Sequence, residues 1–100
     1  MATTMQTSGA LAGVKVLDLS SVILGPYVSQ LMADWGAEVI KIEAPSGDTT
    51  RNLATAKNPG MSAMFMNMNR NKRSLVLNLK KPESQEILAR LVAQSDILVH

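Results

Sequence analysis

An open, parallel α/β sheet with helices on both faces is the fold class that this sequence predicts. Short runs rich in Val, Ile and Leu alternate with amphipathic stretches, the order typical of strands joined by crossover helices. The apolar residues are almost all aliphatic, since the 100 residues hold one Trp, one Tyr and one Phe. A sheet that is buried on both faces favours such an aliphatic core. With 46% hydrophobic residues, the chain suffices for one domain with a single core.

The first expected element is a strand over residues 14–19 (VKVLDL), a short run of Val and Leu that follows a glycine. A loop connects it to a helix over residues 26–35, which Pro26 opens, because the first helical turn tolerates its missing N–H. Gly36 ends this helix in the manner of a C-cap. Helical spacing should turn three apolar side chains toward the sheet: Val28, Leu31 and Met32.

A second strand over residues 38–43 (EVIKIE) comes next, and β-branched residues supply its bulk. Residues 48–60 carry an Asn-Pro-Gly turn signal and predict an irregular segment. Residues 61–68 (MSAMFMNM) fit a short helix that leads into a loop.

Residues 74–79 (SLVLNL) predict a third strand, and a fourth begins at residues 96–99. Between them, residues 82–94 predict a helix that starts at a proline and carries acidic residues in its first turns. Its apolar stripe consists of Ile87, Leu88, Leu91 and Val92. Because the chain stops within an apolar strand, we expect it to be a fragment of a larger domain.

The composition argues against several classes of function. A net charge of +2 does not suit a nucleic-acid binder, which usually shows a strong basic stripe. The absence of Cys excludes disulfides, Cys-based zinc sites and thiol catalysis. No apolar run approaches the roughly 20 residues of a membrane span, and the start lacks a secretory signal. We therefore expect a soluble protein with a flexible leader over residues 1–10.

Three polar segments are candidates for a binding site, and each also fits a structural role. The loop over residues 20–26 joins the first strand to the first helix, but it lacks the glycine fingerprints of dinucleotide and P-loop sites. Glu43 ends the second strand, where an acid can hold a ribose, and Asp48 could pair with Arg51 across the next loop. The basic run over residues 69–74 fits either a surface loop or a phosphate-facing turn.

No residue pattern in the chain predicts catalysis or a metal site. His100 is terminal, and the serines of the first loop lack a partner base. Four carboxylates near strand and helix ends lack a His or second carboxylate at a spacing suited to acid–base chemistry: Asp18, Asp34, Glu38 and Glu43.

Several segments in the same order resemble the opening of class III CoA-transferases, the formyl-CoA transferase and carnitine CoA-transferase-like family. The most specific is Asn-Arg-Asn-Lys-Arg-Ser at residues 69–74, followed by Leu-Asn-Leu-Lys at residues 77–80. Four earlier segments contribute: residues 11–19, 22–26, 31–43 and 47–51. The resemblance implies that residues 11–100 are the amino-terminal, truncated part of a Rossmann-like, CoA-binding large domain.

The resemblance also implies a reaction of acyl-CoA metabolism, in which CoA moves from an acyl-CoA thioester to a carboxylic acid. The family uses an aspartate that forms a mixed anhydride and then an aspartyl-CoA thioester. No Asp in this chain matches that residue, so we expect no catalytic residue here and an inactive chain. Coenzyme A or acyl-CoA enters as a substrate, and no covalently bound cofactor is expected.

By resemblance, seven residues form this chain's part of the CoA site: Ile23, Leu24, Ala44, Leu77, Asn78, Leu79 and Lys80. Ile23 and Leu24 lie on the loop after the first strand. Ala44 matches a position near the adenine, where some family members carry an Arg that can stack on the ring. Residues 77–80 match a segment beside the adenosine, and Lys80 is expected to face a phosphate.

Two alternatives stay open. A fragment of an α-methylacyl-CoA racemase would bind CoA similarly but move a proton at the α-carbon, although the basic run resembles the transferase branch more. A non-catalytic CoA-binding module is the other alternative. For the full-length enzyme, the resemblance implies an interlocked homodimer in the cytoplasm, with acyl-CoA and a carboxylic acid as partners and neither nucleic acid nor membrane. The acyl donor and acceptor are not set by these residues.

Overall fold

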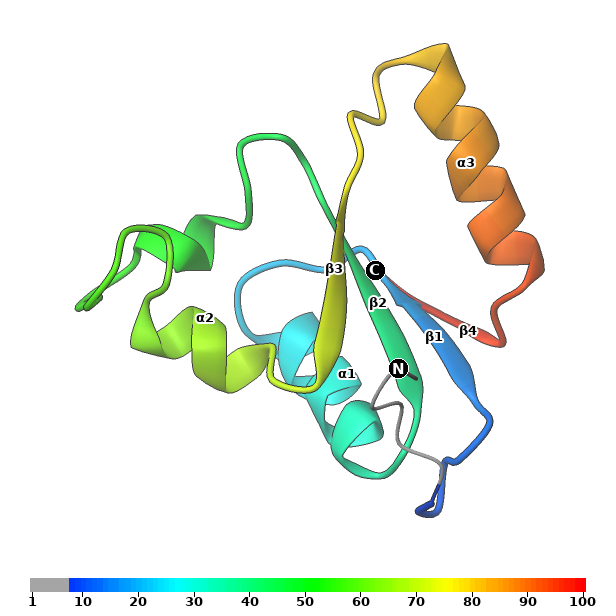
Figure 1. The fold of residues 1–100 in the computed structure, drawn as a ribbon, viewed down its shortest axis with the longest axis horizontal. Coiled ribbons are helices and arrows are strands. Elements are labelled where there is room, and N and C mark those ends of the chain that lie inside the picture. The colour runs from blue at the N-terminus through cyan, green and yellow to red at the C-terminus, as the bar shows by residue number, and fades with distance from the viewer. Residues whose placement is uncertain (1–7) are drawn as a thin grey trace, which may run out of the picture.

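Four parallel strands form one sheet in the computed structural model, which describes residues 8–100 (Figure 1). The elements are β1 (Lys15–Asp18), α1 (Leu24–Asp34), β2 (Glu38–Glu43), the 3₁₀-helix η1 (Thr49–Asn52), α2 (Ala63–Met68), β3 (Lys72–Val76), α3 (Pro82–Ala93) and β4 (Ile97–Val99). The strand order is β3-β2-β1-β4, and every pairing is parallel. The predicted α/β class with a parallel sheet is therefore confirmed.

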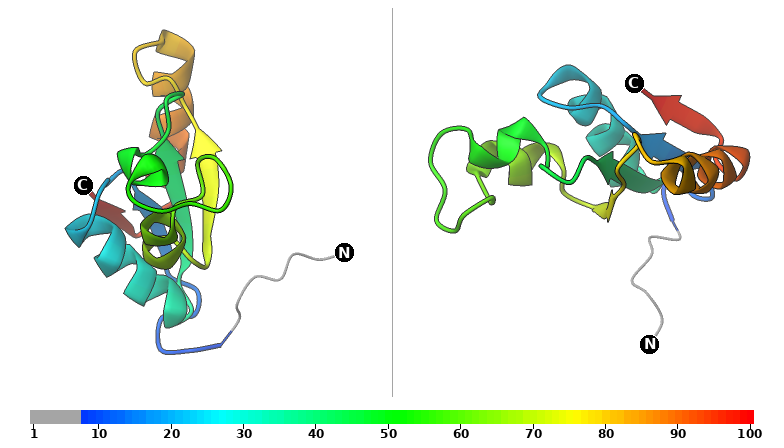
Figure 2. Two further views of the ribbon diagram at one scale, coloured as in Figure 1. Left: turned by 90° about the vertical axis from the view of Figure 1, so that its left-hand side faces the viewer. Right: turned by 90° about the horizontal axis from the view of Figure 1, so that it is seen from above.

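Helices cover both faces of the sheet, with α1 on one side and α3 on the other (Figure 2). Each face has its own apolar cluster, because successive side chains of a strand point to opposite faces. The cluster on the α1 face contains Val16, Ala33, Ala37 and Val39. The cluster on the α3 face contains Leu17, Ile42 and Leu77, against which Leu88 and Leu91 pack.

Helix α3 meets the sheet through a narrower stripe than its sequence predicts. Leu88 and Leu91 are partly buried, but Ile87 and Val92 are 43% and 45% exposed. The two buried residues are three positions apart and form a single row along the helix. Of the predicted apolar stripe, Leu88 and Leu91 therefore pack against the core, and Ile87 and Val92 remain largely exposed.

Helix α1 begins at Leu24, two residues before the expected start, and Pro26 still lies in the first turn, where the N–H groups have no intrahelical acceptor. The apolar spacing predicts that Val28 faces the sheet, but this residue is 39% exposed. The helix turns a more polar row inward instead, because Ser29 Oγ donates to the buried carboxylate of Asp18 at 2.6 Å. Gly36 follows the helix with φ +105°, which confirms the expected glycine stop.

Strand β3 starts and ends earlier than the expected residues 74–79. Its pairing with β2 already begins at Lys72, opposite Val39. The N–H of Leu77 donates to the carbonyl of Glu43, the last residue of β2, at 2.9 Å, and beyond this bond β3 has no strand to pair with on that side. Residues 77–80 therefore leave the sheet and become available as a wall at its carboxyl edge.

The segment expected to be irregular, residues 48–60, contains η1, which Asp48 caps by accepting a hydrogen bond from the N–H of Thr50 at 2.9 Å. The short helix expected after it is confirmed as α2, and Ser62 caps it by accepting from the N–H of Phe65 at 3.1 Å. The first seven residues of the expected leader lie outside the described residues. Within residues 8–100, no helix has the length and apolarity needed to cross a membrane.

Candidate functional site

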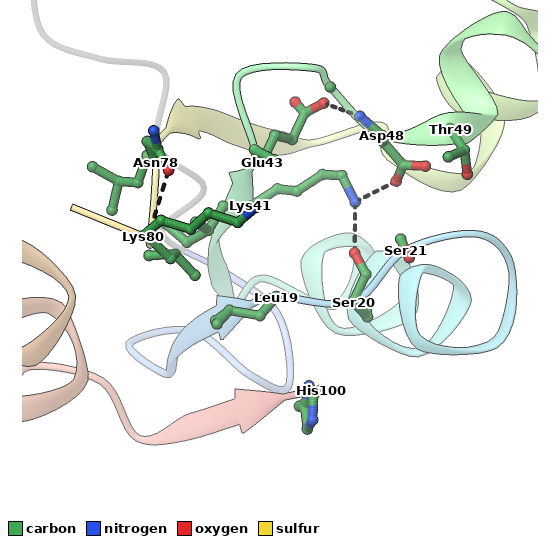
Figure 3. Close-up of a pocket in the computed structure, with 15 residues that line it drawn as sticks. Leu19, Ser20, Ser21, Lys41, Glu43, Asp48, Thr49, Asn78, Lys80 and His100 are labelled. Carbon is green, nitrogen blue, oxygen red and sulfur yellow. Dashed lines mark hydrogen bonds and ion pairs between the residues drawn. The ribbon is translucent and has the colours of Figure 1, made fainter. Parts of the chain in front are cut away.

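A cavity of about 450 Å³ opens at the carboxyl edge of the sheet, where β1, β2 and β3 end (Figure 3). Ligands of open α/β sheets bind at this edge, and pockets of roughly 300–1,000 Å³ accept small molecules. The apolar part of the lining consists of Leu19, Ile42, Leu77 and Leu79. The polar part includes Ser20, Ser21, Asp48, Thr49, Asn78 and Lys80.

The cavity brings together five of the seven residues expected at a ligand site, namely Ala44 and residues 77–80. They come from the loops that follow β2 and β3. Ile23 and Leu24 do not line the cavity; they lie at the start of α1 and are 48% and 77% exposed. The loop over residues 20–21 connects the two groups, since it lines the cavity and leads directly into α1.

Lys80 is the cavity-lining cation that no carboxylate neutralises. Within residues 8–100, none of the ion pairs involves it. The turn before it is fixed, because Asn78 Oδ1 accepts a hydrogen bond from the N–H of Lys80 at 3.1 Å. An exposed ammonium group at the rim of an apolar cavity attracts an anionic ligand group. In the same part of the chain, no three His, Cys, Asp or Glu side chains are grouped so that they could hold a metal ion.

Lys41 lies beneath the polar side of the cavity and is 2% exposed. Its Nζ lies 2.8 Å from Asp48 Oδ2 and donates to the carbonyl of Ser20 at 3.0 Å. Asp48 Oδ1 accepts from the N–H and hydroxyl of Thr50, so the ammonium is the partner of the second carboxylate oxygen. Burial alone would raise the pKa of Asp48, but Lys41 and Thr50 more than offset it, and that pKa lies below its ordinary value.

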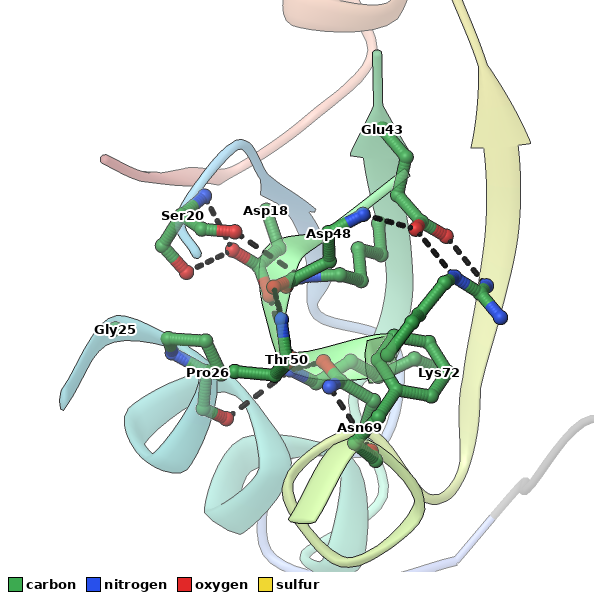
Figure 4. Close-up of polar contacts among 12 residues, drawn as sticks. Asp18, Ser20, Gly25, Pro26, Glu43, Asp48, Thr50, Asn69 and Lys72 are labelled. Atoms are coloured by element: carbon green, nitrogen blue, oxygen red, sulfur yellow. Dashed lines mark hydrogen bonds and ion pairs between the residues drawn. The ribbon is translucent and has the colours of Figure 1, made fainter. Parts of the chain in front are cut away.

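Glu43 is fully engaged by protein donors (Figure 4). Arg51 donates to both of its oxygens at 2.8 Å, Ser74 Oγ donates to Oε2 at 2.7 Å, and the N–H of Asp48 donates to Oε1 at 2.9 Å. The Arg51 guanidinium also lies 3.8 Å from the centre of the Phe65 ring. The Arg51 hydrogen bonds are the main cause that lowers the pKa of Glu43 to about 2, with smaller contributions from Asp48 and Ser74.

Two expectations about this region are therefore wrong. Asp48 and Arg51 do not pair with each other, because Asp48 binds Lys41 and Arg51 binds Glu43. Glu43 cannot hold a ribose, because both of its oxygens already accept hydrogen bonds from the protein.

A second buried ion pair joins Asp18 at the end of β1 to Lys72 at the start of β3, with Nζ 3.0 Å from Oδ2. Lys72 also donates to the carbonyl of Pro26 at 3.0 Å, and Asp18 Oδ1 accepts from the N–H of Ser20 at 2.8 Å and from its hydroxyl. Burial would raise the pKa of Asp18, but hydrogen bonds from Ser20 and Ser29 and the charge of Lys72 lower it overall. Burial is the main cause that lowers the pKa of Lys72.

The basic run over residues 69–74 serves the fold and not the cavity. Arg70 donates to Asp34 at 2.9 Å, and Arg73 pairs with Glu38. None of the six residues lines the cavity, which opens at the other end of β3. The surface-loop interpretation is wrong for residues 72–74, which belong to β3, where the Lys72 side chain is 1% exposed. The phosphate-facing turn stays a prediction.

The turn between β1 and α1 is closely packed beside the cavity. A Cβ atom on Gly25 would lie 2.3 Å from Ser20 Cβ, so this position requires glycine. Val22 has φ +73°, a left-handed conformation that β-branched residues rarely adopt. Such strain persists only where surrounding contacts hold the backbone, and it concentrates at functional turns.

Sequence reasoning missed the buried polar residues beneath the cavity. They occupy alternate positions of three strands and point to the α1 face: Asp18, Lys41, Glu43 and Lys72. The sequence of β2, EVIKIE, contains a signal that could have found them: Lys41 interrupts the apolar run Val39–Ile42 of a strand in the middle of a parallel sheet. A lysine in such a position is almost never buried without a partner.

Comparison with known proteins gives a consistent result. Residues 11–100 match the model of CoA-transferase family III. Over 93% of this chain, the sequence is 44% identical to a formyl-CoA:oxalate CoA-transferase of Streptomyces coelicolor. Over 89% of this chain, it is 41% identical to the human succinyl-CoA:glutarate CoA-transferase. These matches cover 23% and 20% of the two relatives, so the chain spans about a quarter or less of their length.

Solved structures agree with the sequence comparisons. A CAIB/BAIF family protein from Brucella suis superposes with a TM-score of 0.84 and 37% identity, covering 91% of this chain and 25% of that one. Rv3272 from Mycobacterium tuberculosis gives a TM-score of 0.83 and 32% identity, covering 92% of this chain and 26% of that one.

Proposed function

The chain belongs to CoA-transferase family III, and from that premise we propose that it is the amino-terminal, CoA-binding part of an enzyme that moves CoA from an acyl-CoA thioester to a carboxylic acid. The observation that carries this proposal is the cavity at the carboxyl edge of the sheet, where Ala44 and residues 77–80 gather. Relatives named as CoA-transferases support the same reaction class.

The chemistry of the cavity suits the adenosine end of CoA. Flat aliphatic walls from Leu19, Leu77 and Leu79 can pack against an adenine ring, and Ala44 leaves that side of the opening unobstructed. Lys80 supplies the positive charge for a phosphate at the rim. Ile23 and Leu24 would contact the part of CoA that extends out of the cavity along the start of α1.

We assign no catalytic residue to this chain. The carboxylates closest to the cavity are Asp18, Glu43 and Asp48, and each is buried in an ion pair. A nucleophilic carboxylate must be free to reach a thioester carbonyl. The acyl-transfer step would therefore use a carboxylate outside residues 8–100.

The full-length enzyme would act as a cytoplasmic, interlocked homodimer. Apolar side chains on α1 and β4 are exposed and support a partner surface, among them Leu24, Tyr27, Ile97 and Leu98. The partners in the reaction would be an acyl-CoA and a carboxylic acid.

Calorimetric titration of the full-length natural protein with CoA tests the binding site. Lys80→Ala should weaken binding roughly tenfold and reduce its sensitivity to salt, because a charge-assisted contact to phosphate is lost. Lys81→Ala is the matched control, since Lys81 is exposed, adjacent in sequence and outside the cavity. Equal affinity in the Lys80 variant and the wild type would contradict the assigned phosphate contact.

Activity assays then separate the three function classes. Transfer of CoA from an acyl-CoA to a free carboxylic acid would support the transferase. Exchange of the α-proton of a branched acyl-CoA with deuterated water, without transfer, would support a racemase. CoA binding with neither reaction would leave a binding module.

A further inference from the structure

Two neighbouring loops that line the cavity are tied together by one side chain. The loop after β1 carries Ser20 and Ser21, and the loop after β2 carries Asp48 and Thr49. Lys41 lies on the strand between them, and its ammonium contacts the Ser20 carbonyl at 3.0 Å and the Asp48 carboxylate at 2.8 Å (Figure 3).

We propose that Lys41 is a positioning residue of the cavity: its ammonium fixes the spacing between the Ser20 loop and the Asp48 loop, and thereby the shape of the opening that admits the ligand. The identification of that ligand as CoA rests on the proposed function. The bridge itself rests only on the contacts of Lys41.

Fold stability alone does not explain a lysine at this position. A buried ion pair loses its hydration, and apolar residues of similar volume often give a core that is equally stable. The neighbours of Lys41 on β2 are Val39, Ile40 and Ile42, so an apolar residue would continue the strand. Lysine differs from them in carrying several donors at the end of a long side chain, and here these donors reach two loops at once.

Of the two loops that Lys41 contacts, the Ser20 loop contains a residue with a strained backbone, Val22. Asp18 binds the N–H and hydroxyl of Ser20, while Lys41 binds its carbonyl, so Ser20 is held from both sides. Two residues later, Val22 has φ +73°. Loss of the Lys41 contact would free one side of this anchor and let the strained backbone relax away from the cavity-lining geometry.

The test uses a double variant, Lys41→Met with Asp48→Asn, in the full-length natural protein. Lys41→Met alone would leave a buried, unpaired carboxylate and could unfold the protein. The double variant removes both charges together, and the amide oxygen that replaces the carboxylate at position 48 can still accept the Thr50 hydrogen bonds that cap η1. Val39→Ala is the control, because it destabilises the same strand on the α1 face and contacts neither loop.

Hydrogen exchange measures the anchoring without any ligand. In the double variant we expect the amide of Ser20, which donates to Asp18 at 2.8 Å, to exchange at least about tenfold faster, while those of β2 and β3 stay near wild-type rates. Unchanged exchange of the Ser20 amide would overturn the proposal. The Val39→Ala control should raise exchange throughout the sheet without singling out the loop.

Titration with CoA measures the consequence for binding. We expect the double variant to melt near the wild-type temperature but to bind CoA at least about tenfold more weakly, and Val39→Ala to melt lower with nearly normal affinity. Full affinity in the double variant would overturn the positioning role. If the wild type itself does not bind CoA, the proposed function fails, and hydrogen exchange alone decides the role of Lys41.

Discussion

Replacing Glu43 by Gln should destabilise the protein strongly at neutral pH and much less in acid. The pKa of Glu43 falls from its ordinary value of 4.5 to about 2 in the folded state, chiefly through the Arg51 hydrogen bonds. This difference corresponds to ~3 kcal/mol of stabilisation at neutral pH. Because the folded-state pKa is the lower one, the stabilisation is complete above about pH 5 and is lost as the pH falls toward about 2.

The magnitude at an intermediate pH follows from the same two values. At about pH 3.5 the wild type should have lost ~1.4 kcal/mol of the stabilisation that Glu43 contributes at neutral pH. Gln does not titrate, so the difference in unfolding free energy between the two proteins should be smaller by ~1.4 kcal/mol at this pH. Urea denaturation of both proteins at neutral pH and at about pH 3.5 gives the two free-energy differences. Asp18 and Asp48 also titrate in acid, but they do so in both proteins.

Glu86→Gln provides the control for this comparison. Glu86 pairs with Arg90 across one helical turn, and both side chains are at least 70% exposed, so its loss should cost less than ~0.5 kcal/mol. A Glu43→Gln penalty that is the same at neutral pH and at about pH 3.5 would refute the assignment of this stabilisation to the charge of Glu43.

Gly25→Ala should destabilise the protein by ~2 kcal/mol or more and weaken CoA binding, because the new Cβ would lie 2.3 Å from Ser20 Cβ. Urea denaturation measures the first effect and titration with CoA the second. Normal stability and affinity in this variant would contradict the requirement for glycine at this position. The 100-residue chain should self-associate through its exposed apolar edge, and Leu98→Lys on β4 should shift light-scattering masses toward the monomer. Ala89→Lys, which adds the same charge on exposed α3, should leave the masses unchanged.

The alternation of elements and the position of the cavity could be predicted from the sequence. Strand β2 occupies the residues that the sequence predicts for it, because its β-branched run is bounded by clear turn signals. The carboxyl ends of parallel strands meet at one edge, so the residues that follow β2 and β3 converge there whatever their side chains are. The family resemblance places Ala44 and residues 77–80 at a ligand site, and the structure brings them together at this edge.

The partners of the buried charges could not be predicted, because they depend on three-dimensional register. Lys72 is 54 residues from Asp18, and their contact requires that β3 lie beside β2 in the register that sets Lys72 opposite Val39. The same contacts explain the error in α1. An apolar-face rule turns Val28 inward, but the buried Asp18 carboxylate needs a donor, and Ser29 provides it.

The two faces of the sheet have different physical roles. The α3 face is apolar and stabilises the fold by burying Leu17, Ile42 and Leu77. The α1 face buries charged groups: removing one member of a pair is destabilising, whereas replacing both members by apolar residues is often neutral, so the pairs mainly restrict how the chain can be arranged around them. Its pairs lie directly beneath the loops at the carboxyl edge, where Asp18 and Lys41 together hold Ser20. Substitution of Leu17, the buried α3-face residue that does not line the cavity, should therefore change stability at constant affinity. Variants that remove both charges of a pair on the α1 face should instead change affinity at nearly constant stability.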